Sequence, residues 1–554
     1  MSAHTHLVIL LAVAACSSPA PRPTTPPPMP ARPVAPAPPA KVGGLPLARP
    51  VATDRFPGVV ACVRCHTAGD HGQMRDTASA DISPVTDANG AMMALAARDP
   101  YFLAAFRREL AAAPASAAAI EDLCVRCHAP VGYAEAKATG GTLTLDDLVA
   151  TDTPAAALGR EGVGCAGCHA MAPDGLGDEA TLVGRAPLRT DRVAYGLQPE
   201  PLADAMVAMI KTTPIPSPHI GKSELCASCH TVVVRALDAA GHETGDEVAE
   251  QATFLEWRSS GFAVPGAGAK TCQDCHQALV AAPTPFSTRP VAAPARDGYR
   301  RHTIRGGSAY LLSRLAASTD WLHAAATSAQ LTEAAQDTTA FLTSAARLEL
   351  APAGAGLAVT VVNLTGHKLP TGFPTRRMWL HVTARDAQGQ PLLESGAHVH
   401  GAIVGAGGKR LDAPLAILPH VDRITSADDA CVWEAVPVDA AGARTHLLLG
   451  TARFVKDDRI LPAGYRAAKG GNDASRTRPI GTAGDKTFQP GHDTVTVTLP
   501  AGTATVDAEL LFQAIPPETL ESYTARDSRE AAAFLAITMA PPEPQVLARA
   551  HWAR

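Results

Sequence analysis

Ten of the twelve cysteines in this 554-residue chain lie in one pentapeptide, Cys-x-x-Cys-His, which occurs five times. The paired thiols are Cys62 and Cys65, Cys124 and Cys127, Cys165 and Cys168, Cys226 and Cys229, and Cys272 and Cys275; the histidines are His66, His128, His169, His230 and His276. Two thiols at this spacing can form thioethers with the two vinyl groups of one porphyrin. The next residue then lies under the ring, where its imidazole can bind the iron. The repeat therefore predicts five covalently bound haem c groups.

Three alternative roles for paired cysteines fit the spacing less well. A disulfide framework does not require a histidine after every second cysteine. A zinc ribbon pairs CxxC units about 15–20 residues apart, whereas successive copies here begin 62, 41, 61 and 46 residues apart. A thioredoxin-like redox pair is expected once, after a strand.

Length and composition limit the fold and the partners. A chain of 554 residues is long enough for two or three domains. Its formal net charge of −5 indicates neither a nucleic-acid-binding nor a membrane-coating protein. Aromatic residues make up only 4% of the chain. Buried porphyrins would supply planar apolar groups to the interior in their place.

The N-terminus has the features of an export signal. Leu7–Ala15 is an apolar run of nine residues, which is too short to span a bilayer and matches the core of a signal peptide. The run ends at Cys16 in a pattern that resembles bacterial lipoprotein signals, although no Lys or Arg precedes it. We expect a signal peptide at 1–15 and a lipid on Cys16; an ordinary signal peptide cleaved elsewhere is the alternative.

A proline-rich segment follows the proposed lipidation site. Thirteen prolines lie between Pro19 and Pro50, which predicts a semi-rigid spacer within the linker at 16–54. Ser17 follows the cysteine, and by resemblance to bacterial lipoproteins this residue favours anchoring in the outer membrane. We therefore expect an exported protein that is lipid-anchored to the outer membrane and faces the periplasm or the cell surface. Membrane contact would be through the anchor only.

Beyond the linker the sequence predicts three parts and the α+β class. Residues 55–305 hold all five motifs among short helix-like stretches and loops, which we expect to wrap around the haems. Residues 306–350 are rich in Ala and Leu and predict a helical connector. Residues 351–545 alternate short apolar runs with turn residues, which predicts an antiparallel β-sandwich. The expected strands include His398–Val404 and His446–Phe454.

Several stretches resemble a known family, the bacterial multihaem c-type cytochromes with a C-terminal β domain. They include Glu161-Gly-Val-Gly-Cys165, Pro218-His219 ahead of Cys226, and Gly366-His-Lys-Leu-Pro-Thr-Gly-Phe-Pro-Thr-Arg-Arg377. The resemblance extends over nearly all of residues 55–513. It implies the haem count and the fold better than it implies a substrate.

The second axial ligand of each iron decides whether a haem only carries electrons or can also bind a small molecule. We expect second ligands at His219, His302 and His367, and we also consider His71 and Met92, with the adjacent Met93 as the alternative to Met92. For His367 the alternative role is that of a structural loop residue, and for Met92 it is packing in a helix. These candidates do not assign a second ligand to each of the five irons.

Two arginines at the end of the family motif suggest a further contact with the cofactor. Arg376 and Arg377 are expected to clamp haem propionates, because a guanidinium matches a carboxylate in bidentate geometry. A solvated pair at the entry to a strand is the alternative.

These features favour electron transfer between redox proteins of the bacterial cell envelope, with the protein binding, spacing and shielding its haems. The alternative is an oxidoreductase that acts on a small nitrogen or sulfur compound at an open haem. Pentahaem nitrite reductases commonly use CxxCK at the catalytic haem, and this chain has no such motif. A third possibility is that the β domain is a binding module. The sequence assigns no catalytic residue and leaves open whether the protein is an enzyme.

Overall fold

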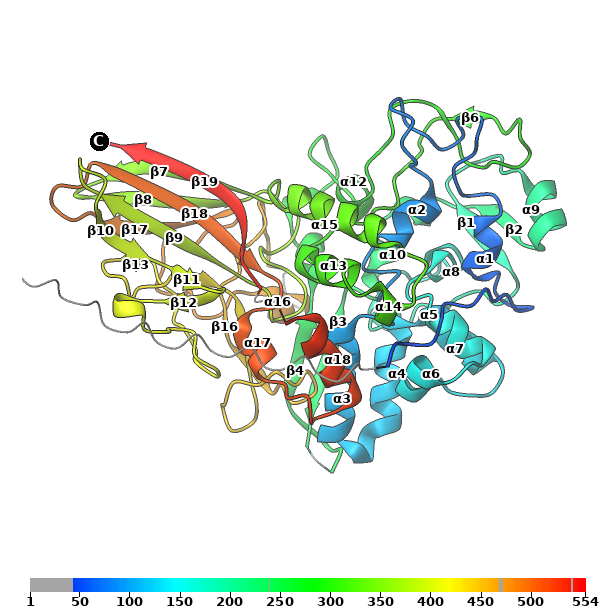
Figure 1. Ribbon diagram of the computed structural model, residues 1–554, viewed down its shortest axis with the longest axis horizontal. Helices are drawn as coiled ribbons and strands as arrows, with labels where there is room; N and C mark the ends of the chain where they lie inside the picture. The colour runs from blue at the N-terminus through cyan, green and yellow to red at the C-terminus, as the bar shows by residue number, and fades with distance from the viewer. Residues whose placement is uncertain (1–42, 239, 468–471, 540–541) are drawn as a thin grey trace, which may run out of the picture. The chain divides into compact units, whose positions relative to one another are not determined.

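The computed structural model describes residues 43–238, 240–467, 472–539 and 542–554, and these belong to one compact unit (Figure 1). The predicted signal peptide, the lipidation site Cys16 and most of the linker at 16–54 lie outside the described residues. Helices and several sheets are both present, which is compatible with the α+β class. The domain boundaries at 305/306 and 350/351 remain predictions. None of the described helices is both long enough and apolar enough to cross a bilayer.

Short helices separated by loops form the part of the chain that holds the motifs. They are α1 (Gly58–Val63), α2 (Pro84–Asn89), α3 (Pro100–Ala112), α4 (Ala117–His128), α5 (Pro130–Ala138), α6 (Leu145–Ala150), α7 (Pro154–Gly159), α8 (Cys165–His169), α9 (Ala203–Ile210), α10 (Glu224–Ala227), α11 (Thr253–Arg258) and α12 (Cys272–His276). Local sequence sets their ends: Asp99 caps α3 ahead of Pro100, and Thr144 forms a capping box on α6. Because the helices are short, the chain turns often, and motifs far apart in sequence can approach one another.

Three two-stranded sheets connect these helices. β1 (Val193–Gly196) pairs in parallel with β2 (Thr213–Pro216), β3 (Val232–Leu237) pairs antiparallel with β4 (Glu243–Gln251), and β5 (Thr284–Pro285) pairs antiparallel with β6 (Ala295–Arg296). β4 ends just before α11, so that Gln251 lies at the junction of a strand and a helix.

The predicted connector does contain helices. They are α13 (Ala309–Ala316), α14 (Thr319–Leu322) and α15 (Ser328–Leu342), and α13 packs against α15. Leu315 of α13 and Leu331 of α15 share one apolar core with Phe106 of α3 and Ile120 of α4. The connector is therefore built into the core of the motif-bearing part.

The C-terminal part has two main sheets. One has the order β10 (Pro391–Ser395), β9 (Arg377–Arg385), β18 (Thr505–Gln513), β19 (Gln545–Ala553), with β14 (Val432–Trp433) also paired to β9; the other has the order β13 (Arg423–Ile424), β17 (His492–Thr498), β8 (Gly356–Asn363), β7 (Ala346–Ala353). Side chains alternate between buried and half-buried along β8, as expected for a strand with one face on a core. Strands of both sheets contribute to one apolar core, as in a sandwich.

Smaller elements complete this part. They are the strand pairs β11 (Ala397–Val399) with β12 (Ala402–Val404) and β15 (Ala435–Val438) with β16 (Arg453–Asp457), and the helices α16 (Asn472–Thr477), α17 (Pro517–Glu521) and α18 (Arg529–Ile537). α18 packs against α3 of the motif-bearing part, with Phe534 fully buried.

Three features of the strands differ from the sequence prediction. The stretch 398–404 is a hairpin instead of one strand, because His400 and Gly401 both have positive φ and form a turn. In the stretch 446–454 only the last residues join β16; earlier in it, the backbone N–H groups of Leu448 and Leu449 donate to the carboxylate of Glu109. β13 pairs with β17 in parallel, whereas the sequence predicted antiparallel pairing throughout.

A cavity lined by the five motifs

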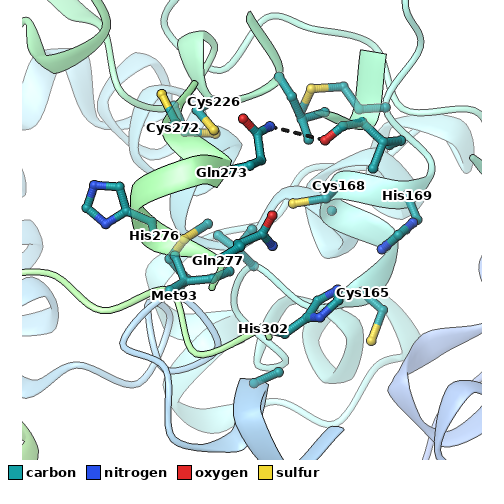
Figure 2. Close-up of a pocket in the computed structure, with 18 of the residues that line it drawn as sticks. Met93, Cys165, Cys168, His169, Cys226, Cys272, Gln273, His276, Gln277 and His302 are labelled. Carbon is teal, nitrogen blue, oxygen red and sulfur yellow. Dashed lines mark hydrogen bonds between the residues drawn. The ribbon is translucent and has the colours of Figure 1, made fainter. Parts of the chain in front are cut away.

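One cavity gathers the five motifs. Its volume is about 1560 Å³, which exceeds the 300–1,000 Å³ or so of a pocket for one small ligand. All five motif histidines and nine of the ten motif cysteines line it, the exception being Cys124. Figure 2 shows cysteines of three motifs and histidines of two around this space, together with His302. The residue types and the size of the cavity fit several haem c groups better than one ligand.

The helical form of the second, third and fifth motifs explains how these three present their groups. α8 and α12 consist of the motif itself, and α4 ends on its motif histidine. On a helix, residues three and four positions apart lie on one face, so both thiols and the imidazole of a motif point the same way. Thr271 forms a capping box with Asp274 and fixes the start of α12 at Cys272.

Every motif histidine is held with the same ring nitrogen free. In each case Nδ1 lies within hydrogen-bonding distance of an oxygen that accepts: Phe286 O for His66 (2.8 Å), Ala96 O for His128 (3.2 Å), Tyr195 O for His169 (2.6 Å), Gln251 Oε1 for His230 (3.0 Å) and Arg305 O for His276 (2.7 Å). Nδ1 therefore carries the proton, and Nε2 keeps its lone pair. Histidines that bind metals are held by their other ring N–H in this way.

Two further histidines line the cavity with the same orientation. Nδ1 of His302 donates to Arg300 O at 3.0 Å, and Nδ1 of His367 donates to Lys368 O at 2.9 Å. Burial lowers the pKa of both imidazoles to about 4, which keeps them in the neutral form that binds a metal.

The rings of these two histidines are each nearly parallel to the ring of a motif histidine, and the distance between the ring centres leaves room for an iron. The ring centres of His169 and His302 are 6.3 Å apart at an interplanar angle of 21°, and those of His276 and His367 are 6.4 Å apart at 22°. A metal–imidazole bond is about 2.0–2.1 Å long and the ring centre lies about 1.1 Å behind the bonding nitrogen, so two imidazoles on opposite sides of one metal have centres about 6.3 Å apart. The two pairs therefore fit two axial ligand sets.

The structure does not favour two of the other expected ligands. His219 is buried but does not line the cavity, and both its ring nitrogens have protein partners, Met171 O at 3.0 Å and Ser217 Oγ at 2.6 Å. His71 is exposed and also lies off the cavity lining. Neither histidine presents a free nitrogen to the cavity, so their role as iron ligands stays a prediction that this geometry does not support.

The methionines remain candidates. Met92 and Met93 both line the cavity, so the structure does not choose between them. Nearby, the ring of Phe102 stacks on the imidazole of His128 with ring centres 3.6 Å apart, a contact that the sequence did not predict. An aromatic residue at helical spacing is typical of a core stripe, and the sequence had no signal to separate Phe102 from the rest of that stripe.

The two arginines of the family motif have different surroundings. Arg376 lines the cavity, and its Nη1 donates to Thr371 O at 2.8 Å. Arg377 is 2% exposed and lies off the cavity; its Nη2 donates to Gln513 Oε1, Gly401 O and Asp412 Oδ2 at 2.8, 3.0 and 2.7 Å. A propionate clamp at Arg377 stays a prediction that this geometry does not support, because protein acceptors already use its donors.

A buried charge network holds the turn that carries His367. Lys368 is fully buried; its Nζ donates to Asp457 Oδ2 at 2.6 Å, and its backbone N–H donates to Glu256 Oε2 at 3.1 Å. Arg459 pairs with Asp457 at 2.7 Å and with Glu256 at 3.3 Å. Two cations and two carboxylates thus balance in the interior. Sequence reasoning missed this network because its three segments, at Glu256, at Lys368 and at 457–459, are about 90 to 200 positions apart in sequence.

Contacts between thiols give the order of the motifs in space. Hydrogen-bonding contact with Cys165 raises the pKa of Cys62, contact with Cys127 raises that of Cys229, and contact with Cys272 raises that of Cys226. Figure 2 shows the Cys226 and Cys272 side chains together.

An electrostatic interaction between the third and fourth motifs links these pairs into one set. Burial raises the pKa of Cys168 to about 12, and the nearby charge of Cys229 acts in the same direction. The third motif therefore adjoins the first and the fourth, and the fourth also adjoins the second and the fifth. The cavity has a branched arrangement of attachment sites, centred on the fourth motif.

Comparison with known proteins adds a distant likeness. No family model matches the chain, and no curated protein matches it. A solved structure, the penta-heme cytochrome c552 from Thermochromatium tepidum, aligns with a TM-score of 0.49 and 17% sequence identity over 90% of this chain and 98% of that chain. At this level, the likeness does not assign the fold or the function of the chain.

Proposed function

We propose that this protein is a multihaem c-type cytochrome that transfers electrons between redox partners of the bacterial cell envelope through five covalently bound haems. The observation that supports it best is the orientation of the histidines: all five motif imidazoles carry their proton on Nδ1 and keep Nε2 free around one cavity. Five unrelated structural histidines have no reason to share that arrangement.

The residues present fit haem c, which when bound supplies reversible one-electron chemistry. The ten motif thiols would attach it, and the motif histidines would bind iron together with His302 and His367. The oxygens that accept from Nδ1 hold each imidazole in place and increase its basicity. Arg376 provides donors in the cavity for a propionate. Neighbouring attachment sites touch through their cysteines, so the cofactors would lie close enough to exchange electrons.

A second function is supported by a specific observation. Among the described residues, the cavity-lining histidines are the five of the motifs, His302 and His367. The histidines His66, His128 and His230 therefore have no paired imidazole in the cavity, and a methionine is the other side chain there that can serve as a second ligand; Met92, Met93, Met171 and Met206 all line it. An open iron next to Arg376 would suit an oxidoreductase acting on a small nitrogen or sulfur compound. Whether the protein is an enzyme depends on that open position.

The location of the protein is also a proposal. Haem c is attached outside the cytoplasm, and the apolar run before Cys16 has the pattern of an export signal. We infer a protein anchored by a lipid on Cys16 to the outer membrane, whose partners are other redox proteins of the envelope.

Low-temperature electron paramagnetic resonance of the purified ferric protein separates the two functions. An electron carrier gives low-spin signals from all the haems. An enzyme gives a high-spin signal that shifts when nitrite or hydroxylamine is added. A variant can also be made in which a side chain fills the open position. If this variant loses the high-spin signal and keeps the low-spin signals, the haem that binds the small molecule is assigned.

A further inference from the structure

A second group of potential metal ligands lies far from the motifs in sequence, in the C-terminal part. His420 precedes β13, Asp485 lies in the loop before β17, and Asp493 is on β17. One ligand atom from each of the three lies within 4.8 Å of the other two. The side chains of His420 and Asp485 are 8% and 4% exposed, and Asp493 is fully buried.

Neighbouring residues form hydrogen bonds with one polar atom of each of these three side chains. Thr487 donates to Asp485 Oδ1 from both its backbone N–H and its hydroxyl, at 2.7 and 2.6 Å. Trp433 Nε1 donates to Asp493 Oδ2 at 2.8 Å. His420 Nδ1 donates to Asp458 Oδ2 at 2.9 Å. These contacts fix each side chain from behind, as the outer shell of a metal site does.

The remaining atoms are those that a cation needs. Asp485 Oδ2 and His420 Nε2 face each other at 3.1 Å. Asp493 Oδ1 is buried and has no hydrogen-bond partner in the protein, which is costly for a carboxylate oxygen. A carboxylate in this state indicates a missing positive partner.

The charges of the group lead to the same conclusion. Asp458, Asp485 and Asp493 bring three carboxylates together, whereas Lys456 is the nearby cation, 3.3 Å from Asp458. Lys456 also pairs with Glu434 at 3.4 Å, so its charge is shared. A protonated His420 would neutralise one carboxylate, and Asp493 Oδ1 would still have no hydrogen-bond partner. A divalent ion would balance the group.

We propose that His420, Asp485 and Asp493 bind a divalent transition-metal ion that ties the segment before β13 and the loop before β17 to the sheet. The donor set of one imidazole and two carboxylates suits Zn²⁺ or Mn²⁺ better than Ca²⁺, which prefers oxygen ligands alone. Two ligands on one Zn²⁺ are about 3.4 Å apart; His420 Nε2 and Asp485 Oδ2 are already 3.1 Å apart, and all three ligand atoms lie within 4.8 Å of one another. When the ion binds, His420 Nε2 gives up the proton that it shares with Asp485.

The test uses the full-length, haem-loaded protein. It is stripped with a chelator, incubated with one to two equivalents of ZnCl2, desalted and analysed by inductively coupled plasma mass spectrometry, which distinguishes zinc from haem iron. The wild type should retain one zinc per chain, and zinc should raise its Tm by several degrees. Asp493→Asn and His420→Gln should retain at least tenfold less zinc and lose the shift in Tm.

Asp412→Asn is the matched control. Asp412 is a buried aspartate of the same part of the chain, but its partners are Arg377 and Arg410, so this variant should lose stability and keep the zinc. The proposal is overturned if the wild type retains neither zinc nor Mn²⁺ added in the same way. It is also overturned if Asp493→Asn and His420→Gln retain as much metal as the wild type, which would indicate binding by surface histidines.

Discussion

Asp457→Asn tests whether charge balance in the interior holds the turn that carries His367. The side chain of Asp457 is 7% exposed and pairs with Lys368 and Arg459, while Glu256 supplies the second carboxylate of the network. The substitution keeps the shape of the side chain and leaves two buried cations with one carboxylate. Breaking a buried pair in this way costs about 3–5 kcal/mol. The unfolding entropy of globular proteins is about 2.1 cal/mol/K per residue, or about 1 kcal/mol/K for a unit of this size, so Tm should fall by about 3–5 °C.

The assay is thermal unfolding followed by circular dichroism, with Glu349→Gln as the control. Glu349 pairs with Arg347 on the surface, where both side chains are more than half exposed, and such a pair contributes at most about 1 kcal/mol. Burial alone would raise the pKa of Asp457, but Arg459 and Lys368 hold it well below its usual range. Its contribution is therefore complete above about pH 4 and is lost as the pH falls further, so the difference between wild type and variant should shrink in acid. A fall in Tm no larger than that of the control would refute the reasoning.

Other predictions concern the axial ligands and a buried carboxyl group. His302→Ala and His367→Ala should each convert one haem in five from low-spin to high-spin, as measured by electron paramagnetic resonance, whereas His219→Ala should convert none; low-spin signals that persist in both of the first two variants would contradict the assignment. Burial raises the pKa of Glu250 to about 8, so its contribution to stability is complete below about pH 4.5 and is lost as the pH rises to 8. Glu250→Gln should therefore remove part of the fall in Tm between pH 6 and 9, and an unchanged pH profile would argue against a neutral Glu250.

The sequence predicted the haem attachment sites and the general architecture because both depend on short patterns. A CxxCH motif is local, and so is the alternation of buried residues along β8. The helices of the connector likewise followed from a run of Ala and Leu. His302 and His367 were chosen for nearby glycines and prolines, and the structure brings each of them to a motif histidine.

The remaining features depend on contacts between distant segments. His219 has the same proline-rich surroundings as a ligand, yet Met171, 48 positions away, accepts from its ring. Arg377 looks like its neighbour Arg376 in the sequence, but Arg377 is the first residue of β9 while Arg376 precedes the strand, and of the two only Arg376 lines the cavity. No local sequence pattern indicates the order of the motifs in space, the charge network around Lys368 or the group of ligands at His420.

The central claim is that haem is bound covalently at all five motifs, and mass spectrometry of the denatured mature protein tests it most directly. Full attachment predicts a single species whose mass exceeds that of the processed polypeptide by five haem groups, and pyridine haemochrome analysis should give five haems per chain. A mass equal to that of the polypeptide, or one accounted for by disulfides or zinc alone, would contradict it.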